Sequence, residues 1–334
     1  MKLLSHSNGI HKVEKDKISK RRMLKKCSIS FIGLLIFGFV IQMITNVVDN
    51  TRLKSRFKYV RINGKKMEYK IKAGGEYTVV FDGAIGTNMY EWDQVCKPIE
   101  DEKKASTFIY NRSGYGFNDG EDVRTPEDQA KDLKLLLRKS GALEPYILVG
   151  EEYGSLVITN FISLYPDSVA GVVLVNPICE EQAKTSEFKK DIKFKYYRSE
   201  FESIGANFSL TSLLSKIGLT MENSIFKEHI TESELYEFNS FKNKNKYKNA
   251  VSNELGNLYK SSSNSQVTGL LGNKPLYLIT DNEEDPIKKI GESASTTVYK
   301  EEIDGSPFSL LDSNAIVNGV NSVLKDVKKS AKKQ

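Results

Sequence analysis

Residues 145–155 read Pro-Tyr-Ile-Leu-Val-Gly-Glu-Glu-Tyr-Gly-Ser, and this stretch decides the fold. A short apolar run, typical of a buried β-strand, meets a Gly-x-x-x-Gly turn and is followed at once by an apolar helical pattern. This is the frame of a nucleophile elbow, a tight strand-to-helix turn that holds a nucleophile above a sheet. The middle position of the turn should be Ser, Cys or Asp, and here it is Glu152.

Strand and helix patterns alternate on both sides of this turn. Thr125-Pro126-Glu127-Asp128 is a strong helix start, and Gly141 ends that helix. The turn Asn63-Gly64-Lys65 predicts a hairpin over residues 56–72. The alternation of strand and helix patterns predicts a mostly parallel sheet with helices on both faces. The buried strands are expected at residues 77–81, 107–110, 146–149, 169–175, 275–280 and 296–299.

The pattern changes over residues 178–273, which are polar, rich in Lys, Asn, Ser and Glu, and mostly helical in character. We interpret this segment as a helical insert between two strands of the sheet. After the last strand, residues 308–324 have the pattern of an amphipathic closing helix. The body is therefore one α/β unit with a helical insertion.

The charge of the chain is concentrated at its N-terminus. The net charge is +6, but residues 1–26 hold nine Lys or Arg against Glu14 and Asp16, so the rest of the chain is close to neutral. A body without net positive charge has no global signature of nucleic-acid binding. No nucleic-acid partner is expected.

An uncharged segment follows this basic tail. Residues 27–48 contain no charged residue, and 22 positions are enough to cross a hydrocarbon core of about 30 Å. A cleaved secretory signal is the alternative, but its apolar region is shorter and ends in a small-residue site that this sequence lacks. We interpret residues 27–48 as a transmembrane signal anchor, with the lipid bilayer as its partner.

The excess of Lys and Arg before the anchor predicts its orientation. Residues 1–26 would form a cytoplasmic basic tail, and residues 49–334 would form an extracytoplasmic domain of a single-pass cell-membrane protein. Three cysteines add little, because Cys96 and Cys179 lack the spacing of a disulfide framework. Whether these two residues pair stays open.

Three stretches, taken in order, resemble the α/β-hydrolase fold, in particular its lid-bearing esterase and peptidase-like branch. They are residues 79–86 (Val-Val-Phe-Asp-Gly-Ala-Ile-Gly), residues 109–116 (Ile-Tyr-Asn-Arg-Ser-Gly-Tyr-Gly) and residues 145–177. The likeness covers about residues 56–325. It implies an α/β fold with a mostly parallel central sheet, helices on both faces and a helical lid over residues 178–273.

The resemblance also implies where catalytic groups belong. The nucleophile maps to Glu152, and the two amides of an oxyanion hole map to Tyr153 and to the loop at Gly83 and Ala84. The catalytic His maps to Pro307. The catalytic acid maps to the loop after residue 280, which contains four carboxylate side chains. They are Asp281, which directly follows the strand, and Glu283, Glu284 and Asp285.

Two of the three triad members are therefore missing. The chain has only three His: His6 and His11 precede the anchor, and His229 lies in the insert, where we expect it at the surface. We interpret Glu152 as a tolerated polar replacement, held by Arg112 or by a backbone N–H. The chain would then be a pseudohydrolase that binds a small molecule or a partner protein.

The alternative is an active hydrolase or lyase of a non-serine type. It would use Glu152 as a nucleophile or as a general base whose pKa burial has raised. Neither reading involves a cofactor or a metal, and none is expected.

Overall fold

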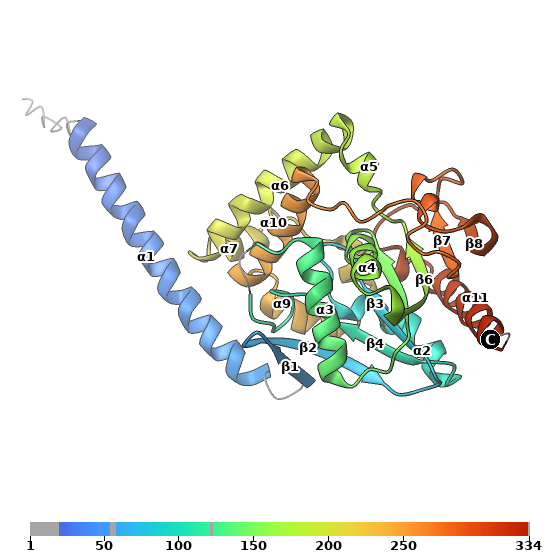
Figure 1. Ribbon diagram of the computed structural model, residues 1–334. Coiled ribbons are helices and arrows are strands. Elements are labelled where there is room, and N and C mark those ends of the chain that lie inside the picture. The colour runs from blue at the N-terminus through green and yellow to red at the C-terminus, as the bar shows by residue number, and fades with distance from the viewer. Residues whose placement is uncertain (1–19, 54–57, 121–122, 333–334) are drawn as a thin grey trace, which may run out of the picture.

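The computed structural model describes residues 20–53, 58–120 and 123–332. The chain begins there with one long helix, α1 (Lys20–Leu53), which stands apart from the body over most of its length (Figure 1). The first 19 residues of the expected cytoplasmic tail lie outside the described residues. The rest of the chain builds one sheet and the helices around it (Figure 1).

The sheet has eight strands in the order β1-β2-β4-β3-β5-β6-β7-β8. The pairs β1–β2 and β2–β4 are antiparallel, and every other pair is parallel. This confirms the predicted α/β fold with a mostly parallel sheet. The strands are β1 (Lys58–Ile62), β2 (Lys65–Lys72), β3 (Thr78–Asp82), β4 (Ser106–Tyr110), β5 (Tyr146–Glu151), β6 (Val169–Val175), β7 (Leu276–Thr280) and β8 (Thr296–Lys300).

Each face of the sheet is covered by helices because the central strands are apolar on both sides. On β5, Ile147 and Val149 belong to one apolar core, whereas Leu148 belongs to the other. The first core also contains apolar residues of α2 and α11, and the second contains those of α3 and α4. These helices are α2 (Asp93–Asp101), α3 (Pro126–Ser140), α4 (Tyr153–Leu164) and α11 (Ser313–Ala331).

Several local signals form as the sequence predicts. Asn63 and Gly64 both have positive φ, which lets the β1–β2 hairpin close in two residues. Thr125 and Asp128 form a capping box at the start of α3, and Gly141 ends that helix in the left-handed conformation. The two signals of α3 fix the start and the end of the helix that precedes β5 in the chain.

Between β6 and β7 the chain forms the helical insert. It contains α5 (Glu180–Ala183), α6 (Ser186–Ala206), α7 (Leu210–Lys216), α8 (Ser224–His229), α9 (Glu232–Phe241) and α10 (Asn245–Lys260). Helices α6 and α10 pack against each other, and the insert covers the end of the sheet where β3 and β5 finish (Figure 1). The expected helical character of residues 178–273 is confirmed.

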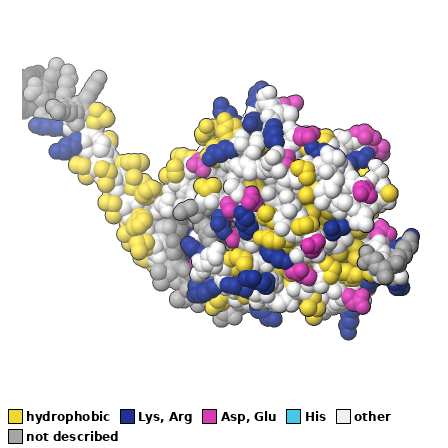
Figure 2. Space-filling view, viewed as in Figure 1, with side chains coloured by type: hydrophobic (Ala, Val, Ile, Leu, Met, Phe, Trp, Pro, Cys, Tyr) yellow, Lys and Arg dark blue, Asp and Glu magenta, His cyan; other side chains and the backbone are white. Residues whose placement is uncertain are grey.

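The N-terminal helix differs in extent from the prediction. Its candidate membrane-spanning part is Arg22–Ile44, which overlaps the predicted residues 27–48, and α1 itself continues to Leu53. One long apolar helix near the N-terminus is compatible with a single-pass anchor. Figure 2 shows hydrophobic side chains along this helix where it stands clear of the body.

Two further predictions are settled by the structure. The helix predicted over residues 308–324 is wrong in its bounds: a 3₁₀ turn at Phe308–Leu310 comes first, and α11 then runs from Ser313 to Ala331. The break arises because the Asp312 side chain accepts a hydrogen bond from the Ala315 N–H and so starts a new helix. Cys96 and Cys179 are both buried free thiols.

Candidate active site

The elbow at the end of β5 has the close packing that its glycines predict. A Cβ at Gly154 would lie 2.2 Å from the Asp82 carbonyl oxygen, and one at Gly150 would lie 3.0 Å from the Gly154 carbonyl oxygen. Between them, Glu152 adopts φ 46° and ψ −112°, a conformation that costs a residue with a Cβ of order 1–3 kcal/mol. The strained turn therefore persists although its central residue is Glu.

The Glu152 side chain is partly buried at the N-terminus of α4. Burial raises the pKa of its carboxyl above the ordinary value, and the Ser306 hydroxyl, Lys195 and the Ile85 N–H offset part of the rise. The Ser306 hydroxyl lies close to the carboxyl, although its oxygen has no well-oriented hydrogen-bond partner among the described residues. Of the donors near Glu152, the Ile85 N–H is the backbone group that stabilises the charged form of its carboxyl.

Glu151 ties the elbow to the loop before α11. Its carboxylate is fully buried and accepts hydrogen bonds from the Phe308 N–H and, at 3.2 Å, from the Ser309 N–H. Burial raises the pKa of Glu151 well above the ordinary value, and the nearby carboxylates of Glu91 and Glu152 raise it further. The residue before the elbow centre therefore holds the loop in which the catalytic His was expected.

The expected oxyanion loop is also supported by a carboxylate. The Ala84 N–H points at Glu91 and lies 3.3 Å from each of its carboxylate oxygens. A Cβ at Gly83 would lie 2.5 Å from the same carboxylate, so Gly83 allows its close approach. Burial raises the pKa of Glu91 to about 7. The amide expected to receive a substrate oxyanion is thus directed at a protein carboxylate.

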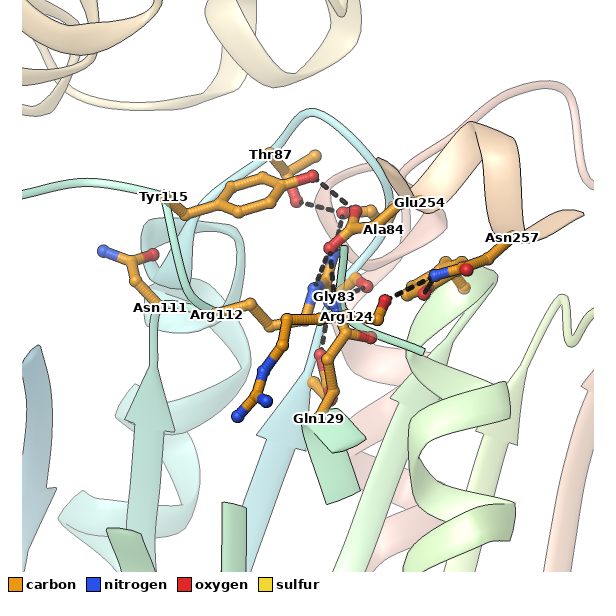
Figure 3. Close-up of polar contacts among 12 residues, drawn as sticks. Gly83, Ala84, Thr87, Asn111, Arg112, Tyr115, Arg124, Gln129, Glu254 and Asn257 are labelled. Carbon is orange, nitrogen blue, oxygen red and sulfur yellow. Dashed lines mark hydrogen bonds and ion pairs between the residues drawn. The ribbon is translucent and has the colours of Figure 1, made fainter. Parts of the chain in front are cut away.

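Arg112 also binds this loop (Figure 3). Its guanidinium donates to the carbonyl oxygens of Gly83, at 2.8 Å, and of Ala84, at 3.1 Å. It also forms buried ion pairs with Asp82 and with Glu254 of α10, the latter at 2.7 Å. Arg112 is therefore committed to the loop and the insert, and it acts on Glu152 only through its charge.

Aromatic side chains close the space beside the loop. The Tyr115 hydroxyl accepts from the Gly86 N–H at 3.1 Å and donates to Glu254, while the Tyr247 hydroxyl of α10 donates to the Gly86 carbonyl oxygen at 2.7 Å. A cavity next to Ala84 and Arg112 has a volume of about 10 Å³. That volume is about the size needed to hold one water molecule.

Residues 77–292 match the sequence profile of a family described as the alpha/beta hydrolase fold, which is more than half of the chain. This chain belongs to the α/β-hydrolase fold family. It is also similar to the uncharacterized protein YqjL of Bacillus subtilis (strain 168), with 26% identity over 140 residues. That match spans 41% of this chain and 54% of YqjL, about half the length of the relative.

Solved structures of other α/β hydrolases share the fold. The epoxide hydrolase CorEH superposes with a TM-score of 0.63 at 14% identity, covering 81% of this chain and 99% of CorEH. The haloalkane dehalogenase DatA from Agrobacterium tumefaciens C58 superposes with a TM-score of 0.59 at 14% identity, covering 81% and 96%. Identities this low show the shared fold and nothing about activity.

The structure places the two positions considered for a catalytic His, Pro307 and His229, in different parts of the molecule. Pro307 directly precedes the two amides that bind Glu151, so the loop expected to carry the His reaches the elbow. His229 is exposed at the end of α8, where its Nδ1 lies 2.8 Å from the Ile225 carbonyl oxygen. The structure therefore brings Pro307 and Glu152 to one place and leaves His229 at the surface.

Two candidates for the catalytic acid, Asp281 and Asp285, differ in their burial. Asp281, which directly follows β7, is exposed. Asp285 is the buried carboxylate of this loop; it accepts hydrogen bonds from the Thr280 hydroxyl and from the Ile287 N–H, each at 3.0 Å. These bonds start the 3₁₀ turn Pro286–Ile290. The Asp-Pro pair at its start is a helix-start signal that could have distinguished Asp285 from its neighbours.

Two buried neighbours of the candidate site, Glu91 and Glu254, could not be found from the sequence. Glu91 lies in a 3₁₀ turn, Met89–Trp92, and Glu254 lies 142 positions after Arg112 on α10. Neither residue belongs to a local motif, and their roles arise only when distant segments pack together. Among the described residues, no group of three or more His, Cys, Asp or Glu is placed to hold a metal ion.

Proposed function

We propose that this chain is a membrane-anchored α/β-hydrolase family member that does not catalyse triad hydrolysis and acts by binding a small ligand or a partner protein. One observation carries the proposal: the carboxyl group of Glu91 accepts from the Ala84 N–H, an amide that the resemblance assigns to a substrate oxyanion. Beside the expected His position, Phe308 and Ser309 donate to Glu151. Glu152 and Pro307 stand where Ser and His would be needed.

The electrostatics of this arrangement oppose acyl transfer. An oxyanion hole works because its N–H groups face the oxygen on which negative charge develops. Here the Ala84 N–H already donates to the buried carboxyl group of Glu91, so this donor is not free to face a substrate oxyanion. A Pro at position 307 supplies no proton acceptor, so no imidazole from this loop could activate Glu152 or a water.

The anchoring part of the proposal rests on α1. The candidate span Arg22–Ile44 is long and apolar enough to cross a bilayer, and basic residues concentrate before it and in its first five positions. The positive-inside rule then favours a cytoplasmic N-terminus and an extracytoplasmic α/β body. A tethered binding protein at the outer face of the cell membrane is the function that these features support together.

A second candidate is favoured by one observation, the raised pKa of Glu152. Burial shifts its carboxyl toward the range in which a general base works at neutral pH. Glu152 could then activate a water without a His, as a hydrolase or lyase of non-serine type. The Ile85 N–H and Lys195 stabilise its charged form and so work against this shift.

A restored active site tests the proposal. The full-length chain with Glu152→Ser, Pro307→His and Glu91→Gln regains the nucleophile, a His and an uncharged oxyanion loop. We expect a fluorophosphonate probe to label this variant at position 152 and not to label the native chain. The same variant with Ala at position 152 is the matched control and should stay unlabelled. Labelling of a Ser in the native chain would contradict the proposal.

A further inference from the structure

The helical insert exposes an apolar surface next to the candidate membrane helix. On α6, Phe194, Tyr197, Phe201 and Ile204 recur every three or four residues and are each more than half exposed. This spacing places them on one side of the helix. The opposite side, which carries Ile192, Ser199, Glu202, Ser203 and Ala206, is buried.

The surface continues beyond α6 into the next segment. Leu213 on α7, and Ile217 and Leu219 just after it, are also more than half exposed. We call these seven residues, three here and four on α6, the α6–α7 apolar face. Large side chains gathered in this way on a soluble surface mark a site that something apolar covers.

The segment between α6 and α7 packs directly on α1. The Ser209 hydroxyl bonds the Gly38 carbonyl oxygen at 2.9 Å and the Gln42 side-chain oxygen at 3.1 Å. A Cβ at Gly38 would lie 2.1 Å from the Phe208 carbonyl oxygen, so only Gly permits this approach. Gly38 and Gln42 are buried there, and Leu35, one turn earlier, is half-buried. Small residues and a bonded hydroxyl are the usual contacts of a helix inside a membrane.

This contact sets the height of the insert relative to a bilayer. Gly38 and Gln42 lie in the C-terminal half of the candidate span Arg22–Ile44. In Figure 1, α6 leads away from α1 at the level of α7 instead of following α1 toward the sheet. A bilayer crossed by α1 would therefore meet α6 along its length.

Charged residues border the face in the way an interfacial helix requires. Lys190 and Lys193 are exposed on α6, one turn before Phe194 and Tyr197 respectively, and Lys216 is exposed on α7. Figure 2 shows basic side chains beside hydrophobic ones in the region of α6. Long basic side chains can lie along apolar surface and place their charge among lipid phosphates.

We propose that the α6–α7 apolar face is embedded in the outer leaflet of the bilayer that α1 spans. The occupant of the face is lipid. The body is then held at two places, by α1 and by the insert, with α6 lying in the membrane interface. This inference rests on the membrane anchoring proposed above, and its test separates the two.

The test places an environment-sensitive label on the full-length chain in liposomes. With Cys27→Ser, the other two cysteines are buried, and single cysteines introduced for labelling report on chosen sites. Ile36→Cys reports on anchoring, Phe201→Cys on the proposed face, and Tyr236→Cys on an equally exposed aromatic position on α9. Unlabelled Cys27→Ser protein provides the background.

We expect the emission at positions 36 and 201 to shift to the blue and to be quenched by lipids with doxyl groups on their acyl chains. The label at position 236 should stay solvent-like and unquenched. Quenching at position 36 without quenching at position 201 would overturn the inference and leave the anchoring intact. A blue shift at position 201 without quenching would also overturn it, because a protein and not lipid would then cover the face. Absence of quenching at position 36 would refute the anchoring itself.

Discussion

Glu254 of α10 forms a buried ion pair with Arg112, whose guanidinium also binds the carbonyl oxygens of Gly83 and Ala84 (Figure 3). Both side chains of the pair are almost fully shielded from solvent. The insert and the loop at Gly83 and Ala84 are thereby joined through one charged group. The loop to which the resemblance assigns an oxyanion-hole amide is thus part of the interface between body and insert.

Removal of one member of this pair should be costly. We expect Glu254→Gln to lower the free energy of unfolding by roughly 3 kcal/mol, because Arg112 would keep a buried charge with only Asp82 to compensate it. Thermal or urea unfolding of the full-length chain in detergent measures the loss. Glu127→Gln, which removes an exposed pair with Lys131, is the control and should leave stability nearly unchanged. Equal effects of the two variants would show that the buried pair does not join insert and loop.

The backbone strain at the elbow gives a second prediction. At φ 46° and ψ −112°, Gly avoids the Cβ penalty that Ala retains, and neither residue carries the Glu152 carboxylate. Glu152→Gly should therefore be more stable than Glu152→Ala by about 1 kcal/mol, measured by unfolding under identical conditions. The same exchange on the unstrained helix α3, Lys131→Gly against Lys131→Ala, should favour Ala. An elbow site that also favours Ala would mean that the strained turn is absent in solution.

Glu91 predicts a pH dependence of stability. Its pKa is raised from 4.5 to about 7 in the folded protein. Below pH 4.5 the carboxyl is protonated in both states; between 4.5 and 7 only the unfolded state releases its proton, so stability falls as the pH rises through this window. Glu91→Gln cannot ionise, and Gln can still accept from the Ala84 N–H. We expect this variant to match the native chain near pH 4.5 and to exceed it above pH 7 by up to about 3 kcal/mol.

Comparing the native chain with Glu91→Gln also controls for the other buried carboxyl groups that titrate in this pH range. Glu68 is also buried, and burial raises its pKa to about 7, but it titrates in both proteins and cancels when they are compared. Unfolding midpoints measured across the window give the result. A constant difference between native chain and variant at all pH values would contradict the raised pKa of Glu91.

Much of the fold could be predicted because its signals are local. Val169–Val175 is a strand with the predicted bounds, and the caps at Thr125 and Gly141 form as expected. The bounds of the last helix were missed because the choice between one helix and a 3₁₀ turn plus helix depends on a single cap at Asp312. Local pattern fixes the type of an element better than its ends.

The site was less predictable because its contacts join distant segments. The elbow could be located from Gly150 and Gly154, whose spacing carries the turn. The partner of the Ala84 N–H could not, since Glu91 reaches it only after the loop folds back. Glu254 reaches Arg112 from the insert, and no local pattern connects the two. The sequence thus indicates which reactive groups are absent and not what replaces them.

The central claim is that the elbow persists in a protein that acts by binding and not by catalysis, and turnover tests it most directly. The purified full-length chain is incubated in detergent with a panel of esters, peptides and epoxides, beside Glu152→Ala. The account predicts that product formation by both proteins equals that of the enzyme-free blank. Turnover by the native chain that disappears in Glu152→Ala would contradict it and would assign Glu152 as the catalytic residue.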